Sequence, residues 1–208
     1  MGEQKRYVVT GIGTDVGKTV VSAIIAQALE ADYWKPIQSG ELENSDSHKI
    51  DRLTNDNVHI LSERYRLTEP LSPHASAAID GVHLQLSELT LPDTNRNLLV
   101  EGAGGLMVPI NDTDLLIDAF KQWDLPVIIV SRHYVGSINH TILTIEALQN
   151  RGIAIKGLVF VGDKNKATES FILHHSNVPF LMRIPLAAEV TIGFVQQQAS
   201  ILKELNCL

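Results

Sequence analysis

A glycine-rich segment near the N-terminus combines a lysine and a hydroxyl side chain in a pattern suited to phosphate chemistry. It reads Gly-Ile-Gly-Thr-Asp-Val-Gly-Lys-Thr over residues 11–19. The backbone N–H groups of such a loop cradle phosphate oxygens, and the N-terminus of the following helix favours negative charge. Lys18 would neutralise the β- and γ-phosphates, and Thr19 would place its hydroxyl on Mg²⁺. The segment therefore predicts a site for ATP and magnesium.

The spacing of this loop narrows the class of protein. Gly11 and Gly17 are separated by one residue more than in the usual motif. The loop alone is compatible with a switch GTPase, a partition ATPase or a metabolic enzyme. A partition ATPase would carry a lysine directly after the first glycine, where Ile12 stands, and residues 163–166 do not spell the Asn-Lys-x-Asp motif of a GTPase. A small metabolic ligase is the favoured class.

A carboxylate, Glu101, stands at the end of an apolar run. P-loop proteins hold or steer their metal with an acidic residue near a strand end. The glycines that follow, Gly102 and Gly104, allow a ligand to approach the backbone closely. Because Cys207 is the only cysteine, a cysteine metal site is excluded. Oxygen ligands of this kind favour magnesium.

A parallel sheet is needed to bring these residues together. Near-continuous apolar runs predict buried strands at residues 7–10, 97–100, 126–131 and 155–161. Helices are expected at about residues 18–29 and after Ser137, which can cap a helix that Gly152 ends. The expected fold class is α/β, a single-domain P-loop fold whose mainly parallel sheet has helices on both faces. The loops after the strands should converge on one edge, where such sheets bind ligands.

Length and charge limit the possible partners. At 208 residues, with 44% hydrophobic and 20% charged residues, the chain suits one domain over residues 1–208. The net charge of -7 disfavours nucleic acid and anionic membranes as partners. The chain shows neither an apolar signal segment nor a run of about 18 apolar residues. We expect a soluble, cytoplasmic protein.

Several separated motifs occur in an order that is typical of one enzyme family. They are TGIGTDVGKT at the phosphate loop, YWKPIQSG at 33–40, NSD at 44–46, EPLSPHASA at 69–77, VEGAGGLMVP at 100–109 and GSINH at 136–140. With these motifs the chain resembles the dethiobiotin synthetases of biotin biosynthesis. That family also has the longer glycine spacing noted above.

The resemblance implies a reaction of 7,8-diaminopelargonic acid, CO₂ and MgATP. One amine captures CO₂ as a carbamate, whose oxygen attacks the γ-phosphate to give a carbamic-phosphoric anhydride. The second amine closes the ureido ring, which leaves dethiobiotin, ADP and phosphate. Phosphoryl transfer of this kind needs mostly positioning and charge neutralisation, so no side-chain nucleophile is required.

The resemblance also assigns roles to residues. Lys35 would contact the carbamate and the γ-phosphate and, with Lys18, form the catalytic pair, although on its own Lys35 would read as a surface lysine before a turn proline. Asp46, by itself a solvated charge in a polar loop, would join Thr19 and Glu101 as a metal ligand. Asp15 and Ser39 would bind the diamine substrate.

The nucleotide site is expected to draw on the phosphate loop, the strand ends and the base-side segments. Its members are Gly13, Thr14, Asp15, Val16, Gly17, Lys18, Thr19, Val20, Asp46, Glu101, Gly102, Ala103, Gly104, Val161, Gly162, Pro185 and Leu186. The resemblance weakens at Val161, where relatives carry an asparagine that holds adenine. We therefore predict relaxed selectivity for adenine. The segment 190–208 is expected only to pack.

The residues Gly136, Ser137, Ile138 and Asn139 open a predicted helix. A helix N-terminus binds a carboxylate well, and the substrate implied by the resemblance has one. In relatives this helix start comes from the neighbouring subunit. The resemblance thus implies a homodimer whose sites are shared across the interface.

Three other interpretations stay open from the sequence. A cobyrinate-type amidoligase normally carries a glutaminase domain with a cysteine nucleophile, for which this chain is too short. An ATP-dependent switch that acts on a protein partner is disfavoured by Ile12 and by the segment from Lys35 to Ser39. A non-catalytic nucleotide-binding module is disfavoured by the intact Lys18 and Thr19 and by the carboxylates at Asp46 and Glu101.

Overall fold

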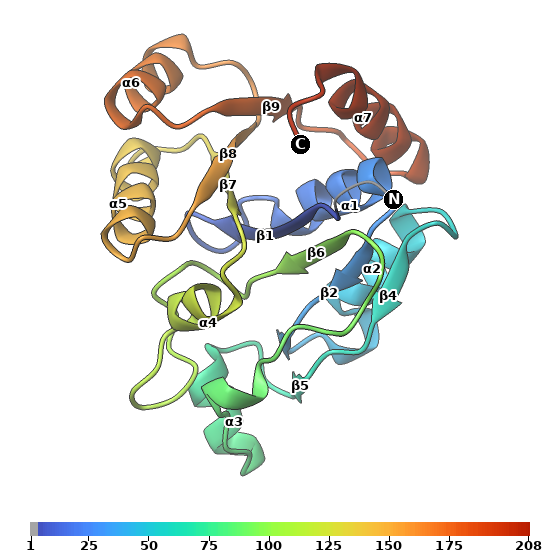
Figure 1. Cartoon of the computed structure of the whole chain (residues 1–208), viewed down its shortest axis with the longest axis vertical. Helices are drawn as coiled ribbons and strands as arrows, with labels where there is room; N and C mark the ends of the chain where they lie inside the picture. The colour runs from blue at the N-terminus through green and yellow to red at the C-terminus, as the bar shows by residue number, and fades with distance from the viewer. Residues whose placement is uncertain (1–3) are drawn as a thin grey trace.

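The computed structural model, which describes residues 4–208, is built on a seven-stranded sheet of order β4-β2-β6-β1-β7-β8-β9 (Figure 1). All neighbouring strands of this sheet run parallel. A second, two-stranded sheet pairs β3 with β5. The strands are β1 Arg6–Gly11, β2 Asp32–Trp34, β3 Ile37–Ser39, β4 His59–Leu61, β5 Tyr65–Leu67, β6 Leu98–Glu101, β7 Val127–Arg132, β8 Ile155–Val161 and β9 Phe180–Ile184.

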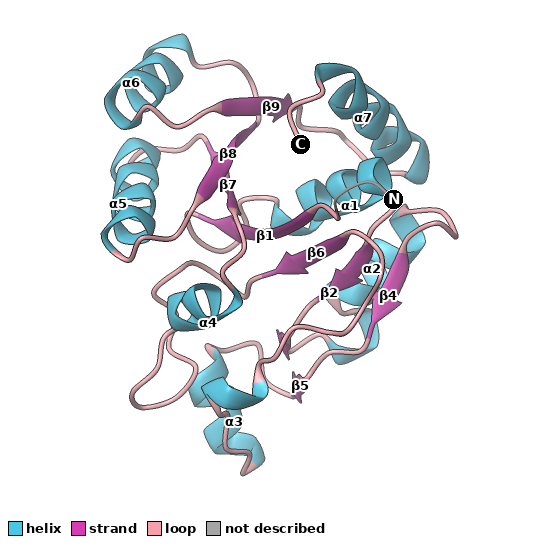
Figure 2. Ribbon diagram, in the orientation of Figure 1, coloured by secondary structure: helices cyan, strands magenta, loops and turns pink. Residues whose placement is uncertain are grey.

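Helices cover both faces of the large sheet (Figure 2). They are α1 Lys18–Leu29, α2 Asp46–Leu53, α3 Pro73–Asp80, α4 Leu116–Trp123, α5 Ser137–Asn150, α6 Lys166–Ser176 and α7 Ile192–Leu205, with short 3₁₀ turns at Leu42–Asn44 and Leu86–Glu88. Helix α1 lies beside α7 on one face, and α5 lies beside α6 on the other. None of the helices in residues 4–208 is both long and apolar enough to cross a bilayer.

The predicted α/β P-loop class is confirmed, and its central elements lie where the apolar pattern placed them. Helix 18–29 and strand 155–161 have the expected bounds, and the other three predicted strands differ by one residue at each end. Most apolar side chains of these strands are buried because helices cover both sides of the sheet. A core of Val, Ile and Leu side chains therefore holds the strand ends in fixed register.

The start of α5 differs from the prediction. Gly136, with φ of 104°, is the N-cap, and no side chain caps this helix end. Ser137 is the first helical residue, so its assignment as a cap is wrong. A residue with a side chain would be strained at this positive φ, which explains why glycine takes the cap position.

Candidate active site

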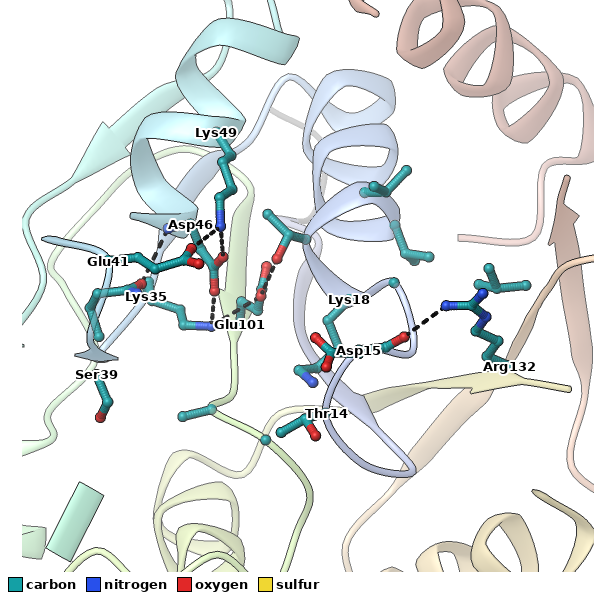
Figure 3. A pocket seen from close by; sticks show the side chains of 18 of the residues that line it. Thr14, Asp15, Lys18, Lys35, Ser39, Glu41, Asp46, Lys49, Glu101 and Arg132 are labelled. Atoms are coloured by element: carbon teal, nitrogen blue, oxygen red, sulfur yellow. Dashed lines mark hydrogen bonds and ion pairs between the residues drawn. The ribbon is translucent and has the colours of Figure 1, made fainter. Parts of the chain in front are cut away.

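A cavity of about 1070 Å³ lies at the C-terminal edge of the large sheet, over the phosphate loop (Figure 3). It gathers residues from elements far apart in the sequence. Those that the sequence predicted and that line it are Thr14, Asp15, Gly17, Lys18, Thr19, Val20, Lys35, Ser39, Asp46, Glu101, Ala103, Gly104, Val161, Pro185 and Leu186. The expected convergence of the strand ends at one edge is therefore observed.

The phosphate loop places Lys18 and Thr19 at the start of α1. Gly17 takes a left-handed conformation with φ of 94°, which lets the chain turn sharply into the helix. The Lys18 Nζ donates to the Gly13 carbonyl at 2.8 Å, so the ammonium folds back over its own loop. Burial, with the charge of Lys35 adding to it, lowers the pKa of Lys18 to about 8, although the charge of Glu101 acts in the opposite direction.

The ammonium of Lys35 joins two carboxylates. It lies 2.7 Å from Asp46 Oδ2 and 3.0 Å from Glu101 Oε1, and its residue is only 4% exposed. Burial alone would lower the pKa of Lys35, but the charges of Glu101 and Asp46 outweigh it and raise the pKa above its usual value. Burial works against the charged form of Asp46, but Lys35 overcomes this and lowers the pKa of Asp46. Both Lys35 and Asp46 are thus held in their charged forms.

Glu101 is held from two further sides. Thr19 Oγ1 donates to Glu101 Oε1 at 3.1 Å, and the Tyr33 hydroxyl donates to Oε2 at 3.0 Å. Burial, followed by the charge of Glu101, raises the pKa of Tyr33 well above its usual value, so this hydroxyl stays a donor. Tyr33 was not among the residues predicted from the sequence. Tyr33 lies two residues before Lys35, and its strand β2 pairs with β6, which ends at Glu101. The sequence does not show this pairing, so it does not show that Tyr33 lies near Glu101.

A second lysine, also missed, lies on α2 one turn after Asp46. Lys49 Nζ is 2.6 Å from Glu41 Oε2 and 3.5 Å from Asp46 Oδ1. Although partial burial opposes it, the hydrogen bond with Glu41 and the charge of Asp46 raise the pKa of Lys49. Both Glu41 and Lys49 line the cavity, so the carboxylate of Asp46 lies between two cations (Figure 3).

Both residues predicted for the diamine, Ser39 and Asp15, line the cavity. Ser39 ends β3 and lines the cavity, and its buried hydroxyl oxygen has no hydrogen-bond partner in residues 4–208. Asp15 takes a left-handed conformation with φ of 54°, and its side chain is exposed in the cavity wall. A hydroxyl that is buried without a partner is costly unless a ligand satisfies it, which favours Ser39 as a contact.

The end of the cavity where the nucleotide base is expected, called the base end below, is apolar apart from Arg132. Val161, Pro185 and Leu186 all line this end, and Gly162 follows Val161 with φ of 107°. Val190 and Phe194 also line the cavity, so the C-terminal segment does more than pack against the sheet. Helix α7 reaches this position because it lies along α1, the helix that carries the phosphate loop.

Some predicted residues do not line this cavity. Gly13, Val16, Gly102 and Gly162 lie next to lining residues in the chain, and Gly13 contributes its carbonyl to Lys18. The segment Gly136, Ser137, Ile138 and Asn139 does not reach the cavity of its own chain. Its expected role is in the site of a neighbouring subunit.

Known sequences show which family the chain belongs to. A family model described as an AAA domain matches residues 5–192. The chain is 54% identical to the ATP-dependent dethiobiotin synthetase of Christiangramia forsetii, over 86% of this chain and 87% of that protein. It is 48% identical to the synthetase of Cytophaga hutchinsonii, over 90% of this chain and 91% of that protein. It is 45% identical to the synthetase of Brucella ovis, over 89% of this chain and 88% of that protein. The chain belongs to the dethiobiotin synthetase family.

Dethiobiotin synthetases are ATP-dependent ligases, and this chain is accordingly an ATP-using P-loop enzyme. Its fold is similar to that of the cell division ATPase MinD of Pyrococcus furiosus, with a TM-score of 0.66 and 15% identity over 98% of each chain. A putative plasmid partition protein of Borrelia burgdorferi matches with a TM-score of 0.63 and 13% identity, over 99% of this chain and 98% of that one. At these identities the likeness concerns the fold alone.

Proposed function

We propose that the protein closes the ureido ring of dethiobiotin from 7,8-diaminopelargonic acid, CO₂ and ATP. The observation that carries the proposal is the ammonium of Lys35, buried between Asp46 and Glu101 beside a phosphate loop. A buried cation at the place where the γ-phosphate would lie suits a reaction that builds negative charge there. Membership of the dethiobiotin synthetase family makes a carbamate the fitting phosphate acceptor.

The nucleotide would lie with its phosphates on the loop and its base against Val161, Pro185 and Leu186. The loop amides and Lys18 would hold the β- and γ-phosphates. Apolar walls at the other end suit the faces of a base.

A magnesium ion would draw on Thr19, Asp46 and Glu101. These groups are hard oxygen donors, and hydrogen bonds already connect them through Glu101 and Lys35. Within residues 4–208, no three or more His, Cys, Asp and Glu side chains group as a metal cage. That suits magnesium, which binds through one or two carboxylates together with phosphate oxygens and water. When bound, the ion would supply positive charge at the phosphates.

Lys35 would orient the reacting groups. One substrate amine attacks CO₂, loses a proton and becomes a carbamate, and the carbamate oxygen then attacks the γ-phosphorus as ADP leaves. The second amine attacks the carbonyl carbon, the bond to phosphate breaks, and the amine proton is lost. Lys35 and Lys18 would hold the charge that develops on the transferred phosphoryl group.

The substrate would extend from the phosphate loop towards a second subunit. Asp15 and Ser39 would contact the diamine, and the N-terminus of α5, Gly136 to Asn139, would bind the substrate carboxylate of the partner's site. In this proposal residues 1–208 act as one domain in a cytoplasmic homodimer that serves biotin biosynthesis.

One assay tests the proposed reaction. Phosphate release from MgATP is measured with the diamine and bicarbonate together and with each omitted, and dethiobiotin is identified by mass spectrometry. We expect phosphate release in equal amount to dethiobiotin, and only in the complete mixture. Release that is indifferent to the diamine would instead indicate a switch ATPase and refute the proposal.

A further inference from the structure

The base end of the cavity has one polar side chain, that of Arg132, which the sequence analysis did not single out. The other residues that line this end come from β8, β9, α7 and the loop between them, and all are apolar: Val161, Ile184, Pro185, Leu186, Ala187, Val190 and Phe194. Side-chain hydrogen bonds to the nucleoside part of a nucleotide can therefore come from Arg132 and from no other described lining residue at this end.

The topology places Arg132 between the phosphate loop and the apolar wall. Strands β1, β7, β8 and β9 follow one another in the sheet, and Arg132 is the last residue of β7. Arg132 is in register with Val161, and registered residues of neighbouring parallel strands point to the same face. A nucleotide with phosphates over β1 and a base against β8 and β9 must pass across this position.

The guanidinium of Arg132 is only partly engaged. Its Nη1 donates to the carbonyl of Asp15 at 3.2 Å, and this bond turns the side chain towards the phosphate loop (Figure 3). It forms no ion pair with a carboxylate of residues 4–208, and its remaining donors have no partner among these residues. The residue is exposed within the cavity wall. An arginine without a carboxylate has donors to offer to a ligand.

We propose that Arg132 contacts the nucleoside part of the bound nucleotide and determines which bases the enzyme accepts. The inference rests on the proposed function in that it takes this cavity as the nucleotide site. A guanidinium only donates, so it bonds to acceptors such as N7 and O6 of a purine and gains nothing from the amino group of adenine. With apolar side chains elsewhere at this end, Arg132 would accept guanine and hypoxanthine as well as adenine.

Arg132→Ala is tested by equilibrium binding of magnesium complexes of ATP, GTP and inorganic tripolyphosphate, without the diamine. We expect the variant to bind MgATP about tenfold more weakly, the loss of one charge-assisted hydrogen bond, and to bind MgGTP more weakly still because guanine offers O6 as well as N7. Tripolyphosphate should bind as tightly as to the parent. Equal weakening of tripolyphosphate would mean that Arg132 only supports the loop through Asp15, and unchanged binding of all three would mean no contact. Either result overturns the proposal.

Arg132→Gln gives the second measurement. A glutamine amide both donates and accepts, and it can pair with N6 and N7 of adenine. We expect the ratio of the GTP to the ATP dissociation constant to rise about tenfold in this variant. An unchanged ratio would contradict a contact with the base.

The matched control is Arg151→Ala, which removes a half-buried arginine that follows α5 and does not line the cavity. It should leave all three dissociation constants at the parent values. Circular dichroism and thermal melting of each variant check that the fold is intact. Because these measurements need no diamine, they can succeed or fail independently of the ring-closing reaction.

Discussion

At the scale of single residues, the electrostatics of the site depend on Lys35. Its ammonium is shared between two carboxylates that are themselves candidate metal ligands, so the same oxygens can meet either cation. Tyr33 and Thr19 fix the orientation of Glu101 around this pair. A small displacement of one of these side chains therefore changes the positions of the others.

Replacing Lys35 with Met keeps most of the length of the side chain but removes the ammonium and its charge. We expect kcat for phosphate release to fall by about a hundredfold or more, as when a charge-stabilising donor is removed from an active site. Steady-state kinetics with saturating MgATP measure the effect, and Lys203→Met, which changes an exposed lysine of α7, is the control. A kcat equal to that of the parent would refute the role of Lys35.

The lowered pKa of Lys18 predicts a pH dependence of nucleotide binding. The free enzyme carries the charged form below pH 8 and loses it above, because burial brings the pKa to about 8. Phosphates bind the charged form, so the dissociation constant of MgADP should rise above about pH 8, by up to about tenfold per pH unit. Titrations at several pH values measure it.

Lys18→Arg is the control for this pH profile, because the arginine keeps its charge throughout the range. Whether this variant binds MgADP more tightly or less tightly than the parent, its dissociation constant should change much less with pH above pH 8. The same slope in both proteins would assign the titration to another group.

At the scale of elements, α2 determines where Asp46 lies. Ser45 caps this helix: its hydroxyl accepts from the backbone N–H of His48 at 3.3 Å, and the Ser45 N–H donates to the His48 ring at 3.3 Å. Asp46 is the first helical residue, so its carboxylate direction depends on this cap.

Ser45→Ala should therefore affect both stability and metal use. We expect the free energy of unfolding to fall by about 1 kcal/mol, the usual cost of a lost cap, and the magnesium concentration for half-maximal activity to rise. Urea unfolding and a magnesium titration at fixed ATP measure the two effects. Ser45→Asp, which keeps an acceptor at the cap, should restore most of the stability. If Ser45→Ala lowers the stability but leaves the magnesium dependence unchanged, the cap stabilises α2 without positioning the carboxylate of Asp46.

Elements also explain how far the sequence could predict the site. The phosphate loop and strand 155–161 were predictable because contiguous residues encode them, whereas the three-residue strands β2 and β4 are too short to show a periodic pattern. Tyr33 and Arg132 were not predicted, because the strand order and not the sequence brings Tyr33 close to Glu101 and Arg132 beside Val161. The cap of α5 was misassigned because serine is the commoner cap, while the left-handed backbone at residue 136 requires glycine.

At the scale of the whole molecule, the proposed homodimer determines where the substrate carboxylate would bind. The α5 N-terminus does not reach its own cavity, and apolar side chains around it are exposed. Val135 is fully exposed, and Tyr134 and Ile138 are 43% and 36% exposed. Exposed apolar residues that lie together favour an interface with another protein surface, which in the proposed homodimer would be a second copy of the chain.

A shared site predicts complementation between two inactive variants. Lys35→Met disables the phosphate side of a site, and Asn139→Ala disables the helix start that serves the partner's site. In a heterodimer of the two, one site has both parts intact. A one-to-one mixture refolded together should therefore regain about a quarter of the parent activity, since about half of the dimers are mixed and each has one good site. Mixtures that stay inactive while size-exclusion chromatography shows dimers would mean that each subunit builds its site alone.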